Sequence, residues 1–582
     1  MARRAQARAA GVPFLALLFV AGLTVWSGSA PGQVLLQPLA VDGQPAPGVP
    51  GALFGPGFTT PRMSESGHVA FSVHLDGTFG DDSIWMGRAG SLTLIARENT
   101  PAPGTTSDFQ AFREPWLGSS VRLGFFAWIQ EAAPHAPTTQ SLWLWEQGVL
   151  TLLDLPDDPA AGELMWEFAA PPGSAGQIAV SSTGLQDNTY RKCIWSGLPG
   201  ALTRIACEAD PAPDEAEGTV FGGSDVGFLH TAINDAGEIA FVATVDPPDA
   251  IQGPMLGVWT NRGGPLRRVL RQGSPVPGAP AGTQFAWFDR PQFTLEDEVI
   301  CPASAGLQFP YATGLWRDGA QTFEPLVTLG QAAPGMPAGV SFNGVVPLIS
   351  VNRSGLCAVV AYVDGPGVTE QNNQGLWLGR PGALSLIART GEPAPGTLEG
   401  TLFGLLYSPE HGVLEDPPRL NDAGQVVFGA ALAGPQVDEA NQIGFWAVDR
   451  SRRVHKVLQL ADPVETAPAI EPHAFSIDVS QQLSRHGEFA MRLYLHDPYH
   501  QGVFQATILE VWPDFDVDGD VDLDDFGHLQ ACMSGPGIRQ DDPACRDADL
   551  DRDDDVDLVD FGLLQRCYSG PGQPALPGCQ DE

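Results

Sequence analysis

Two short Asp-rich segments near the C-terminus have the residue types and spacing of a metal site. They read DFDVDGDVDLDDF from Asp514 and DLDRDDDVDLVDF from Asp549, 35 residues apart. In each segment acidic side chains fall at loop positions 1, 3, 5, 9 and 12, and position 8 is a valine, Val521 or Val556. Calcium takes roughly six to eight oxygen ligands at about 2.3–2.6 Å, and this spacing wraps carboxylates around one ion. The pattern therefore predicts two calcium-binding loops.

The sequence after each loop supports this interpretation. Both loops are followed by a segment with helical character, FGHLQAC or FGLLQRC, and position 7 would supply a backbone carbonyl, from Asp520 or Asp555. An acidic run can also be a solvated, disordered tail. Two copies with the same spacing, the same valine and the same following helix favour calcium loops over a tail.

Together the two copies resemble the type I dockerin module, in which each EF-hand-like loop is followed by one helix and none precedes it. The resemblance implies side-chain ligands Asp514, Asp516, Asp518, Asp522 and Asp525 for one ion, and Asp549, Asp551, Asp553, Asp557 and Asp560 for the other. Position 6 of the second loop is Asp554, where glycine is usual. Because aspartate adopts the left-handed region less readily than glycine, we expect weaker binding there. Dockerins usually carry Ser-Thr after the ninth position, whereas this chain has Leu523-Asp524 and Leu558-Val559, a departure that argues against an ordinary cohesin partner.

Most of the chain before these loops is built of repeats. One unit, from Phe342 to Gly396, contains four β-rich pieces: FNGVVPLISVN, SGLCAVVAYV, QGLWLG and ALSLIARTGEPAPG. Short apolar pieces bounded by Gly, Pro or Asn are typical of strands in a meander. The second piece recurs with its glycine at Gly67, Gly176, Gly237, Gly355, Gly424 and Gly487, and degenerate copies place Arg122 and Glu298 at that register. Intervals of 54 to 69 residues indicate a propeller, solenoid or array.

The two ends of the array predict a closed ring. The chain starts with a single strand, Val34–Val41, and a Pro-Ala-Pro-Gly turn, whereas the last unit, Phe475–Ile508, has only three strands. The first strand can complete the last sheet and leave no exposed edge. We expect an all-β fold over residues 31–510, an eight-bladed β-propeller of four-stranded blades closed by the N-terminal strand. A small α-helical dockerin-like domain over residues 511–582 follows it.

Each repeat carries one large aromatic residue in its third piece. These residues are Trp85, Trp143, Trp195, Trp259, Trp316, Trp377, Trp446 and Phe504. A row of tryptophans could form a platform for sugar stacking. One aromatic residue per repeat instead favours a packing role, in which each ring fills the same gap between adjacent sheets.

The eight cysteines are compatible with disulfides in an exported protein. None lies in a CxxC pair, which disfavours a thiolate zinc site. Cys532 with Cys545 and Cys567 with Cys579 occupy matching places in the two C-terminal copies, and Cys193 and Cys207 flank one turn symmetrically. We predict these three disulfides. Cys301 and Cys357 remain as candidates for a bond between neighbouring repeats.

The repeat also resembles a known family. INDAGEIAF (Ile233–Phe241) and LNDAGQVVF (Leu420–Phe428) carry its second piece most fully. The array over residues 34–510 resembles bacterial secreted proteins that consist of tandem NxxGxxAF repeats with varied C-terminal anchoring modules, the choice-of-anchor type. The resemblance supports the repeat architecture and implies no established chemistry.

Residues 1–30 have the features of a secretory signal peptide. Arg3, Arg4 and Arg8 precede an apolar run of 15 residues, from Val12 to Trp26, and a Gly-Ser-Ala stretch follows. The run is shorter than the roughly 20 residues that a membrane span needs. We expect a mature protein that is secreted, extracellular or associated with a cell surface, and that has no membrane span.

Composition and missing motifs narrow the function. The net charge of −38 argues against nucleic acid and anionic membranes as partners. The eleven histidines show no HExxH spacing, and the sequence contains no GxSxG elbow, no GxxxxGK and no GxGxxG after a strand. The sequence therefore offers no catalytic residues.

Two functions are compatible with these patterns. The first is a secreted, non-catalytic binding or scaffold protein, whose calcium-binding module mediates attachment to a cohesin-like or cell-surface protein, with a polysaccharide as another candidate partner. The second is a carbohydrate-active enzyme, a polysaccharide hydrolase or lyase, because dockerins often accompany such domains and propellers can hold active sites in the central channel. Repeat units that deviate from the consensus mostly keep the apolar pattern, which favours the first function.

Overall fold

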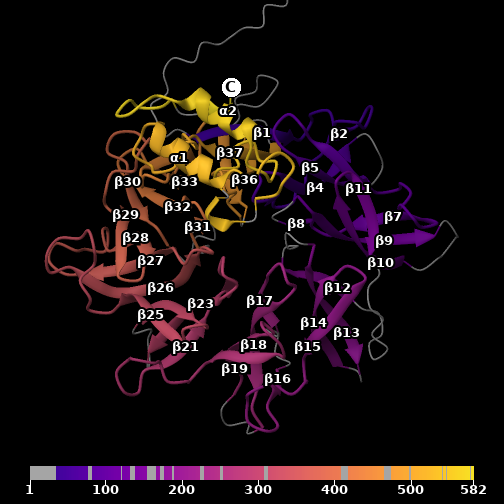
Figure 1. Ribbon diagram of the computed structural model, residues 1–582, viewed down its shortest axis with the longest axis horizontal. Helices are drawn as coiled ribbons and strands as arrows, with labels where there is room; N and C mark the ends of the chain where they lie inside the picture. Colours follow the sequence, from indigo (N-terminus) through magenta and orange to yellow (C-terminus); the bar gives the residue numbers. More distant parts are fainter. Residues whose placement is uncertain are drawn as a thin grey trace, which may run out of the picture.

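The computed structural model describes residues 34–76, 81–118, 121–131, 138–153, 165–170, 176–186, 189–222, 228–248, 253–306, 312–407, 417–464, 473–480, 482–496, 500–540, 542–545, 547–576 and 579–581. The expected signal peptide, residues 1–30, lies outside the described residues. Eight antiparallel sheets follow one another around a ring, as Figure 1 shows. The fold is an eight-bladed β-propeller, which confirms the architecture expected from the repeats.

Blades 1 to 4 form the first half of the ring. Blade 1 contains β2 (Leu53–Phe54), β3 (Arg62–Met63), β4 (Val69–Asp76), β5 (Asp81–Gly87) and β6 (Thr93–Arg97). Blade 2 contains β7 (Ser107–Phe112), β8 (Trp116–Leu117), β9 (Leu123–Glu131), β10 (Thr138–Glu146) and β11 (Val149–Leu153). Blade 3 contains β12 (Met165–Ala170), β13 (Ile178–Gln186), β14 (Thr189–Leu198) and β15 (Ala201–Cys207). Blade 4 contains β16 (Val220–Phe221), β17 (Phe228–Ile233), β18 (Ile239–Asp246), β19 (Met255–Thr260) and β20 (Arg267–Arg271).

Blades 5 to 8 complete the ring. Blade 5 contains β21 (Gln284–Phe288), β22 (Gln292–Phe293), β23 (Val299–Gly306), β24 (Ala312–Arg317) and β25 (Thr322–Thr328). Blade 6 contains β26 (Ser341–Val351), β27 (Cys357–Asp364), β28 (Gln374–Arg380) and β29 (Ala383–Arg389). Blade 7 contains β30 (Leu402–Leu405), β31 (Arg419–Leu420), β32 (Val426–Ala433), β33 (Ile443–Val448) and β34 (Val454–Gln459). Blade 8 contains β35 (His473–Val479), β36 (Glu488–His496), β37 (His500–Ile508) and, from the other end of the chain, β1 (Val34–Val41).

The first strand of five blades is interrupted. In blade 1, for example, β2 and β3 both pair with β4, through Leu53 opposite Asp76 and Arg62 opposite Ala70. Each of these five blades is therefore four-stranded, and its first strand consists of two pieces. Because proline lacks the N–H that a ladder needs, it ends such pairing. In four of these blades a proline directly precedes the second piece, namely Pro61, Pro115, Pro291 and Pro418.

The N-terminal strand closes the ring, as its isolated position in the sequence predicted. β1 runs antiparallel to β37, from Val34 opposite Ile508 to Val41 opposite Gly502. The pairing continues past β1, where the Asp42 N–H donates to the Gln501 carbonyl at 2.9 Å. The sheet of blade 8 thus has no unpaired edge at β37.

The NxxG turn between the first and second strands joins neighbouring blades. In blade 6 the Asn352 side-chain oxygen accepts from Ser354 and Leu356 N–H groups, and its nitrogen donates to the Asn421 carbonyl in blade 7 at 3.0 Å. Asn421 in turn donates to the Ser484 carbonyl of blade 8 at 2.7 Å. The asparagine of the repeat motif therefore both forms its own turn and bonds to the next blade.

In two degenerate turns the structure differs by one residue from the glycine register expected from the sequence. The glycine position in this turn has positive φ, as at Gly67 (φ 83°). In blades 2 and 5 that position is held by Val121 (φ 53°) and Asp297 (φ 59°), not by Arg122 and Glu298, which lie one residue later. The one-residue error arose because neither segment has a glycine to mark the positive-φ residue.

The repeated aromatic residues are packing residues. Trp85, Trp143, Trp259, Trp377 and Trp446 are all fully buried, with 0% exposure. Each also meets a phenylalanine from the first strand edge-on, with ring centroids 4.9–5.1 Å apart. A buried ring cannot stack on a sugar, so the platform interpretation is wrong for these five tryptophans.

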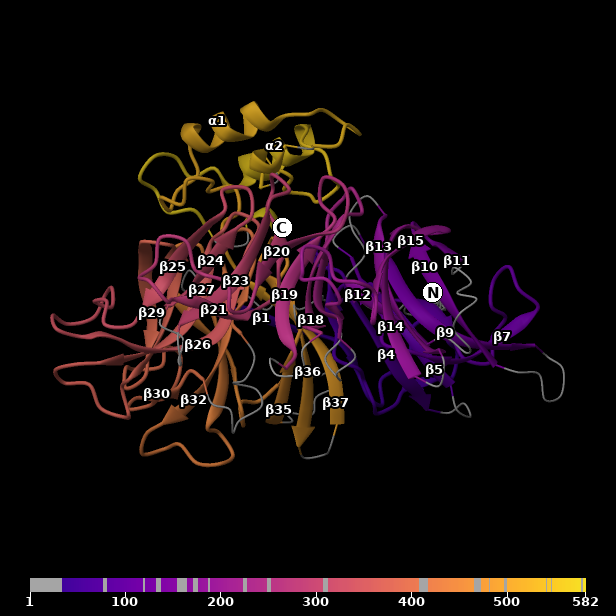
Figure 2. The same ribbon diagram turned by 90° about the horizontal axis from the view of Figure 1, so that it is seen from below.

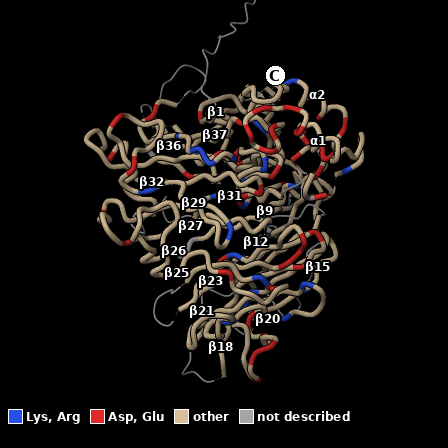
Figure 3. The backbone as a smooth tube through the Cα atoms, turned by 60° about the vertical axis from the view of Figure 1, so that its left-hand side comes forward, with Lys and Arg blue, Asp and Glu red and all other residues tan. Residues whose placement is uncertain are grey.

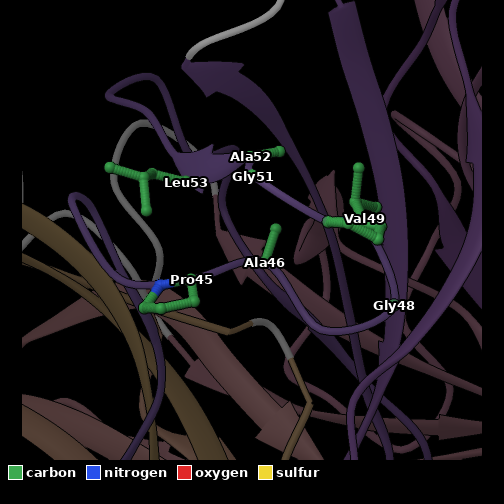
Figure 4. Close-up of a pocket in the computed structure, with 8 residues that line it drawn as sticks. Pro45, Ala46, Gly48, Val49, Gly51, Ala52 and Leu53 are labelled. Carbon is green, nitrogen blue, oxygen red and sulfur yellow. The ribbon is translucent and has the colours of Figure 1, made fainter.

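Two Pro-Gly turns, Ala-Ala-Pro-Gly at residues 332–335 and Pro-Ala-Pro-Gly at residues 393–396, accept hydrogen bonds from these indoles. The Trp377 N–H donates to the Pro334 carbonyl at 2.9 Å, and that of Trp446 to the Pro395 carbonyl at 3.0 Å. The first such turn, residues 45–48, leads from β1 toward β2. Figure 4 shows it as one side of a shallow pocket lined by residues of that single connection.

Three disulfides form as predicted: Cys193–Cys207, Cys532–Cys545 and Cys567–Cys579. The suggested bond between Cys301 and Cys357 is wrong, because both are buried free thiols. Cys301 packs in the layer between blades 4 and 5, and Cys357 packs in the layer between blades 5 and 6. Blade 5 therefore lies between the two sulfur atoms.

The C-terminal segment forms two helices, α1 (Leu523–Cys532) and α2 (Leu558–Cys567), with two short 3₁₀ turns, η2 (Pro543–Cys545) and η3 (Cys579–Asp581). Figure 2 shows α1 and α2 above one face of the ring. A small core that includes Val521, Leu529, Val556 and Leu564 holds them together. Among the described residues, no helix has the length and apolar character needed to cross a membrane.

Candidate metal centre

Each Asp-rich loop ends by capping a helix. Asp522 is the N-cap of α1, and its side chain accepts from the Asp524 N–H, while the Asp525 side chain accepts from the Asp522 N–H. Asp557 and Asp560 make the same capping box at α2. Capping satisfies N–H groups that the first turn of a helix leaves free. The residues at loop positions 9 and 12 are therefore fixed by the helix that follows them.

The fold brings the aspartates of each loop together. In the first loop, single carboxylate oxygens of Asp514, Asp516 and Asp525 lie within 4.8 Å of one another. A second group consists of Asp520, Asp522 and Asp525 with the same limit. Oxygens this close repel one another as anions unless a cation or protons lie between them.

The second loop groups positions 1, 3 and 5 where the first loop groups positions 1, 3 and 12, and both loops group positions 7, 9 and 12. Oxygens of Asp549, Asp551 and Asp553 lie within 4.8 Å of one another, and so do those of Asp555, Asp557 and Asp560. Asp518 is the one predicted side-chain ligand outside these groups, and its carboxylate accepts from the Asp520 N–H at 3.1 Å. The structure thus brings together nine of the ten predicted side-chain ligands, four in the first loop and five in the second.

Hydrogen bonds to the side chains at position 7 connect the two halves of the module. The Asp520 side chain accepts from the Gly572 N–H, and the Asp555 side chain accepts from the Gly537 N–H. These glycines belong to matching Ser-Gly-Pro-Gly segments after α2 and α1, a sequence repeat that is a further signal of the two-fold module. The Val521 and Val556 carbonyls accept from the same two segments.

One oxygen in each half has no hydrogen-bonding partner. The Oδ1 atoms of Asp520 and Asp555 are buried and unpaired, and the two residues are only 5% and 4% exposed. A buried anionic oxygen without a donor is costly. Each of these residues also contributes a carboxylate oxygen to one of the groups described above. The donor set, all carboxylate and carbonyl oxygen, fits a hard ion such as calcium.

The raised pKa values of two loop aspartates reflect the same crowding of carboxylates. Burial raises the pKa of Asp514 to about 6, with the charge of Asp525 adding to the effect. In the second loop burial, together with repulsion from Asp560, Asp553 and Asp549, raises the pKa of Asp551 to about 7. Figure 3 shows the acidic segments gathered around α1 and α2. Without a cation, these loops are therefore poised to take up protons.

The residue at position 6 of each loop has a positive φ, as the resemblance to dockerins implied. Gly519 has φ 102°, and Asp554 at the same place in the second loop has φ 72°. A non-glycine residue in the left-handed region is strained. The second loop therefore folds at a conformational cost that the first loop avoids.

The module is anchored to blades 7 and 8. Arg450, in the turn after β33, pairs with Glu510 at 2.7 Å and lies over the Trp512 ring at 4.7 Å. His486, in the turn before β36, packs against the same ring, with ring centroids 4.9 Å apart. Burial lowers the pKa of His486 well below its usual range, so this histidine is neutral at neutral pH. Ala423 of blade 7 also packs against the module core.

The second loop contacts the propeller through two ion pairs. Arg485 of blade 8 donates to the Asp549 carboxylate at 2.7 Å, and Arg552 of the loop donates to Glu488 of blade 8 at 2.8 Å. Asp549 is the first predicted ligand of this loop. Neither arginine could be recognised as a contact residue from the sequence, because nothing in a single sequence places the two segments side by side.

The fold and the site define the class of the protein: an eight-bladed β-propeller that carries a small two-loop acidic module on one face. The model of DUF7453, a family of unknown function, matches residues 18–171 and 165–489. The chain belongs to this family. The match ends before the C-terminal module begins, so the module lies outside the part that matches.

No curated protein matches the sequence. Among solved structures, Pyrococcus horikoshii acylaminoacyl peptidase is similar at 8% identity and a TM-score of 0.32, over 75% of this chain and 57% of the peptidase. The Dos1 propeller is similar at 8% identity and a TM-score of 0.35, over 81% and 95% of the two chains. The polysaccharide lyase Uly1 is similar at 9% identity and a TM-score of 0.31, over 82% and 99%. At these identities and scores, the likenesses carry no functional argument.

Proposed function

We propose that the protein is a secreted, non-catalytic binding or scaffold protein that holds two calcium ions in a dockerin-like C-terminal module. The observation that carries the proposal is the paired geometry of the two loops. Each gathers aspartate oxygens within 4.8 Å of one another, and each leaves one buried carboxylate oxygen without a donor. A solvated acidic tail is not expected to form two such carboxylate clusters.

The proposed ligands follow from the loop positions. Side chains of Asp514, Asp516, Asp518, Asp522 and Asp525, with the Asp520 carbonyl, hold the first ion; those of Asp549, Asp551, Asp553, Asp557 and Asp560, with the Asp555 carbonyl, hold the second. Calcium neutralises crowded carboxylates that otherwise repel one another. Because the folded module binds the ions and the unfolded chain does not, calcium stabilises the fold.

The module also offers a surface for attachment. Leu523 is 69% exposed, Leu558 72% and Val559 54%, at the positions that follow the ninth-position ligands. Exposed apolar side chains of this kind suit a protein partner. We propose a cell-surface or scaffold protein, cohesin-like in role, whose matching surface is apolar where an ordinary cohesin would meet Ser-Thr. Secretion follows from the expected signal peptide at residues 1–30.

Calcium titration of the intact mature chain by isothermal calorimetry, after removal of bound ions with chelator, tests this function. We expect two bound ions per chain. Asp516→Ala should remove the first and Asp551→Ala the second. Asp524→Asn, in the same acidic stretch but at a non-ligand position, should leave both. Binding of no calcium by the wild-type chain would refute the calcium function and return the segment to an acidic surface domain.

A polysaccharide screen tests the non-catalytic half of the proposal. Purified protein incubated with plant and algal polysaccharides should release no reducing ends and no unsaturated products. Turnover that follows the protein through further purification would favour the alternative function, a polysaccharide hydrolase or lyase. Binding of a polysaccharide without turnover would agree with the proposal and would identify a propeller ligand.

A further inference from the structure

The propeller makes the two loops of the module unequal. The second loop contacts blade 8 through Arg485 with Asp549 and Arg552 with Glu488, and all four side chains are at least four-fifths buried. In the part of the chain that the structure describes, no propeller side chain forms an ion pair or hydrogen bond with a carboxylate of the first loop. Within these residues, only the second loop therefore has a carboxylate that pairs with a propeller arginine, whereas Arg450 pairs with Glu510 just before the first loop and acts on Asp514 only through its charge.

The residue type at the position of Arg485 in the repeat varies between blades. Arg485 follows the first residue of the NxxG-type turn of blade 8. The matching residues are Glu65 in blade 1, Asp235 in blade 4 and Asp422 in blade 7, all acidic, whereas blade 6 has Arg353. An acidic residue at position 485 would repel the loop. Blade 8 thus carries a cation where it faces the acidic loop.

The ion pair with Arg485 involves Asp549, which is a proposed calcium ligand. Asp549 Oδ2 accepts from Arg485 and from the Asp554 N–H, and Oδ1 accepts from the Asp553 N–H. The Asp549 side chain is only 3% exposed, so little water screens the pair. A guanidinium 2.7 Å from the carboxylate neutralises it, and the same positive charge repels a cation that approaches it.

We propose that Arg485 and calcium compete for Asp549, so that calcium in the second loop weakens the docking of the module on the propeller. This inference rests on the calcium function proposed above. Coupling between two binding events is reciprocal: if docking lowers the calcium affinity by some factor, calcium lowers the docking equilibrium by the same factor. Among the described residues, the first loop has no carboxylate paired with a propeller arginine, so calcium there should affect docking less.

Calorimetric titration of the full mature chain tests the competition. Asp516→Ala removes the first site and leaves the second loop to be observed alone. In that background Arg485→Gln should tighten calcium binding by about tenfold, within the range of roughly 5- to 150-fold typical of such coupling. Arg353→Gln, at the matching turn position of blade 6, is the control and should leave the affinity unchanged. Equal or weaker binding by the Arg485→Gln chain would overturn the inference.

Hydrogen exchange of the unmutated chain gives a second, independent readout. Calcium should speed amide exchange in the peptide that covers residues 484–488, because the module uncovers that turn. In Arg485→Gln the turn should already exchange fast without calcium. Slower or unchanged exchange in the wild-type turn on addition of calcium would contradict the competition.

The two proposals fail in different ways. If the wild-type chain binds no calcium, the calcium function is wrong and the competition falls with it. If it binds two ions and Arg485→Gln changes neither affinity nor exchange, only the competition is wrong.

Discussion

Closure of the ring by β1 can be tested by removing that strand alone. We compare a mature chain that starts at Asp42 with one that starts at Val34. β1 contributes Leu39, Ala40 and Val41, which are 8%, 0% and 4% exposed. Burial of the two larger side chains stabilises the fold by about 3–6 kcal/mol in total, at roughly 1.5–3 kcal/mol each. The lost ladder to β37 adds to this, at about 0.5–1.5 kcal/mol for each hydrogen bond.

The loss is large beside the roughly 5–15 kcal/mol that stabilises a typical domain. We expect the unfolding midpoint in scanning calorimetry to fall by about 10 °C or more, and the shortened chain to aggregate through the free edge of β37. A synthetic peptide with the sequence of residues 34–41 should restore part of the midpoint, and a scrambled peptide should not. Midpoints within about 2 °C of each other for the two chains would refute closure by this strand.

Three further predictions concern single residues. Trp377→Phe should lower the free energy of unfolding in denaturant by about 1–3 kcal/mol more than Trp316→Phe, because the Trp377 N–H bonds to Pro334 whereas the buried Trp316 N–H has no partner; equal losses would contradict this. Asp554→Gly should be more stable than Asp554→Ala by about 1 kcal/mol in thermal unfolding, because the residue has φ 72°, and no difference would show that the turn relaxes. In chelator, the calorimetric stability of the module should rise as the pH falls from about 8 to about 6. Burial raises the pKa of Asp551 to about 7, so the stability linked to its proton is lost as the pH rises through that value; a flat profile would contradict the crowding.

Much of the fold could be predicted because its signals are local and repeated. Strand length, turn glycines and one large aromatic residue per unit recur in the sequence, and the count of these repeats predicts eight blades. The isolated strand before Pro45 indicated closure. The disulfides Cys532–Cys545 and Cys567–Cys579 followed from a repeat of the same kind. Where a repeat lost its glycine, at Val121 and Asp297, the register was wrong by one residue.

The site could be predicted less completely, because its remaining features depend on contacts between distant segments. Ligand spacing identified the aspartates. It could not show that Asp520 bonds to Gly572 or that Asp549 meets Arg485, since 52 and 64 residues separate these partners. Cys301 and Cys357 illustrate the same limit, because only the packing of blade 5 between them shows that they cannot meet.

The central claim is that this module binds calcium in two matched sites. A crystal structure of the mature chain grown in calcium, with anomalous diffraction data, tests it most directly. We predict two anomalous peaks per chain, one bounded by Asp514, Asp516 and Asp525 and the other by Asp549, Asp551 and Asp560, with oxygen ligands at about 2.3–2.6 Å. Well-ordered loops with water and no anomalous peak at either place, in millimolar calcium, would contradict the account.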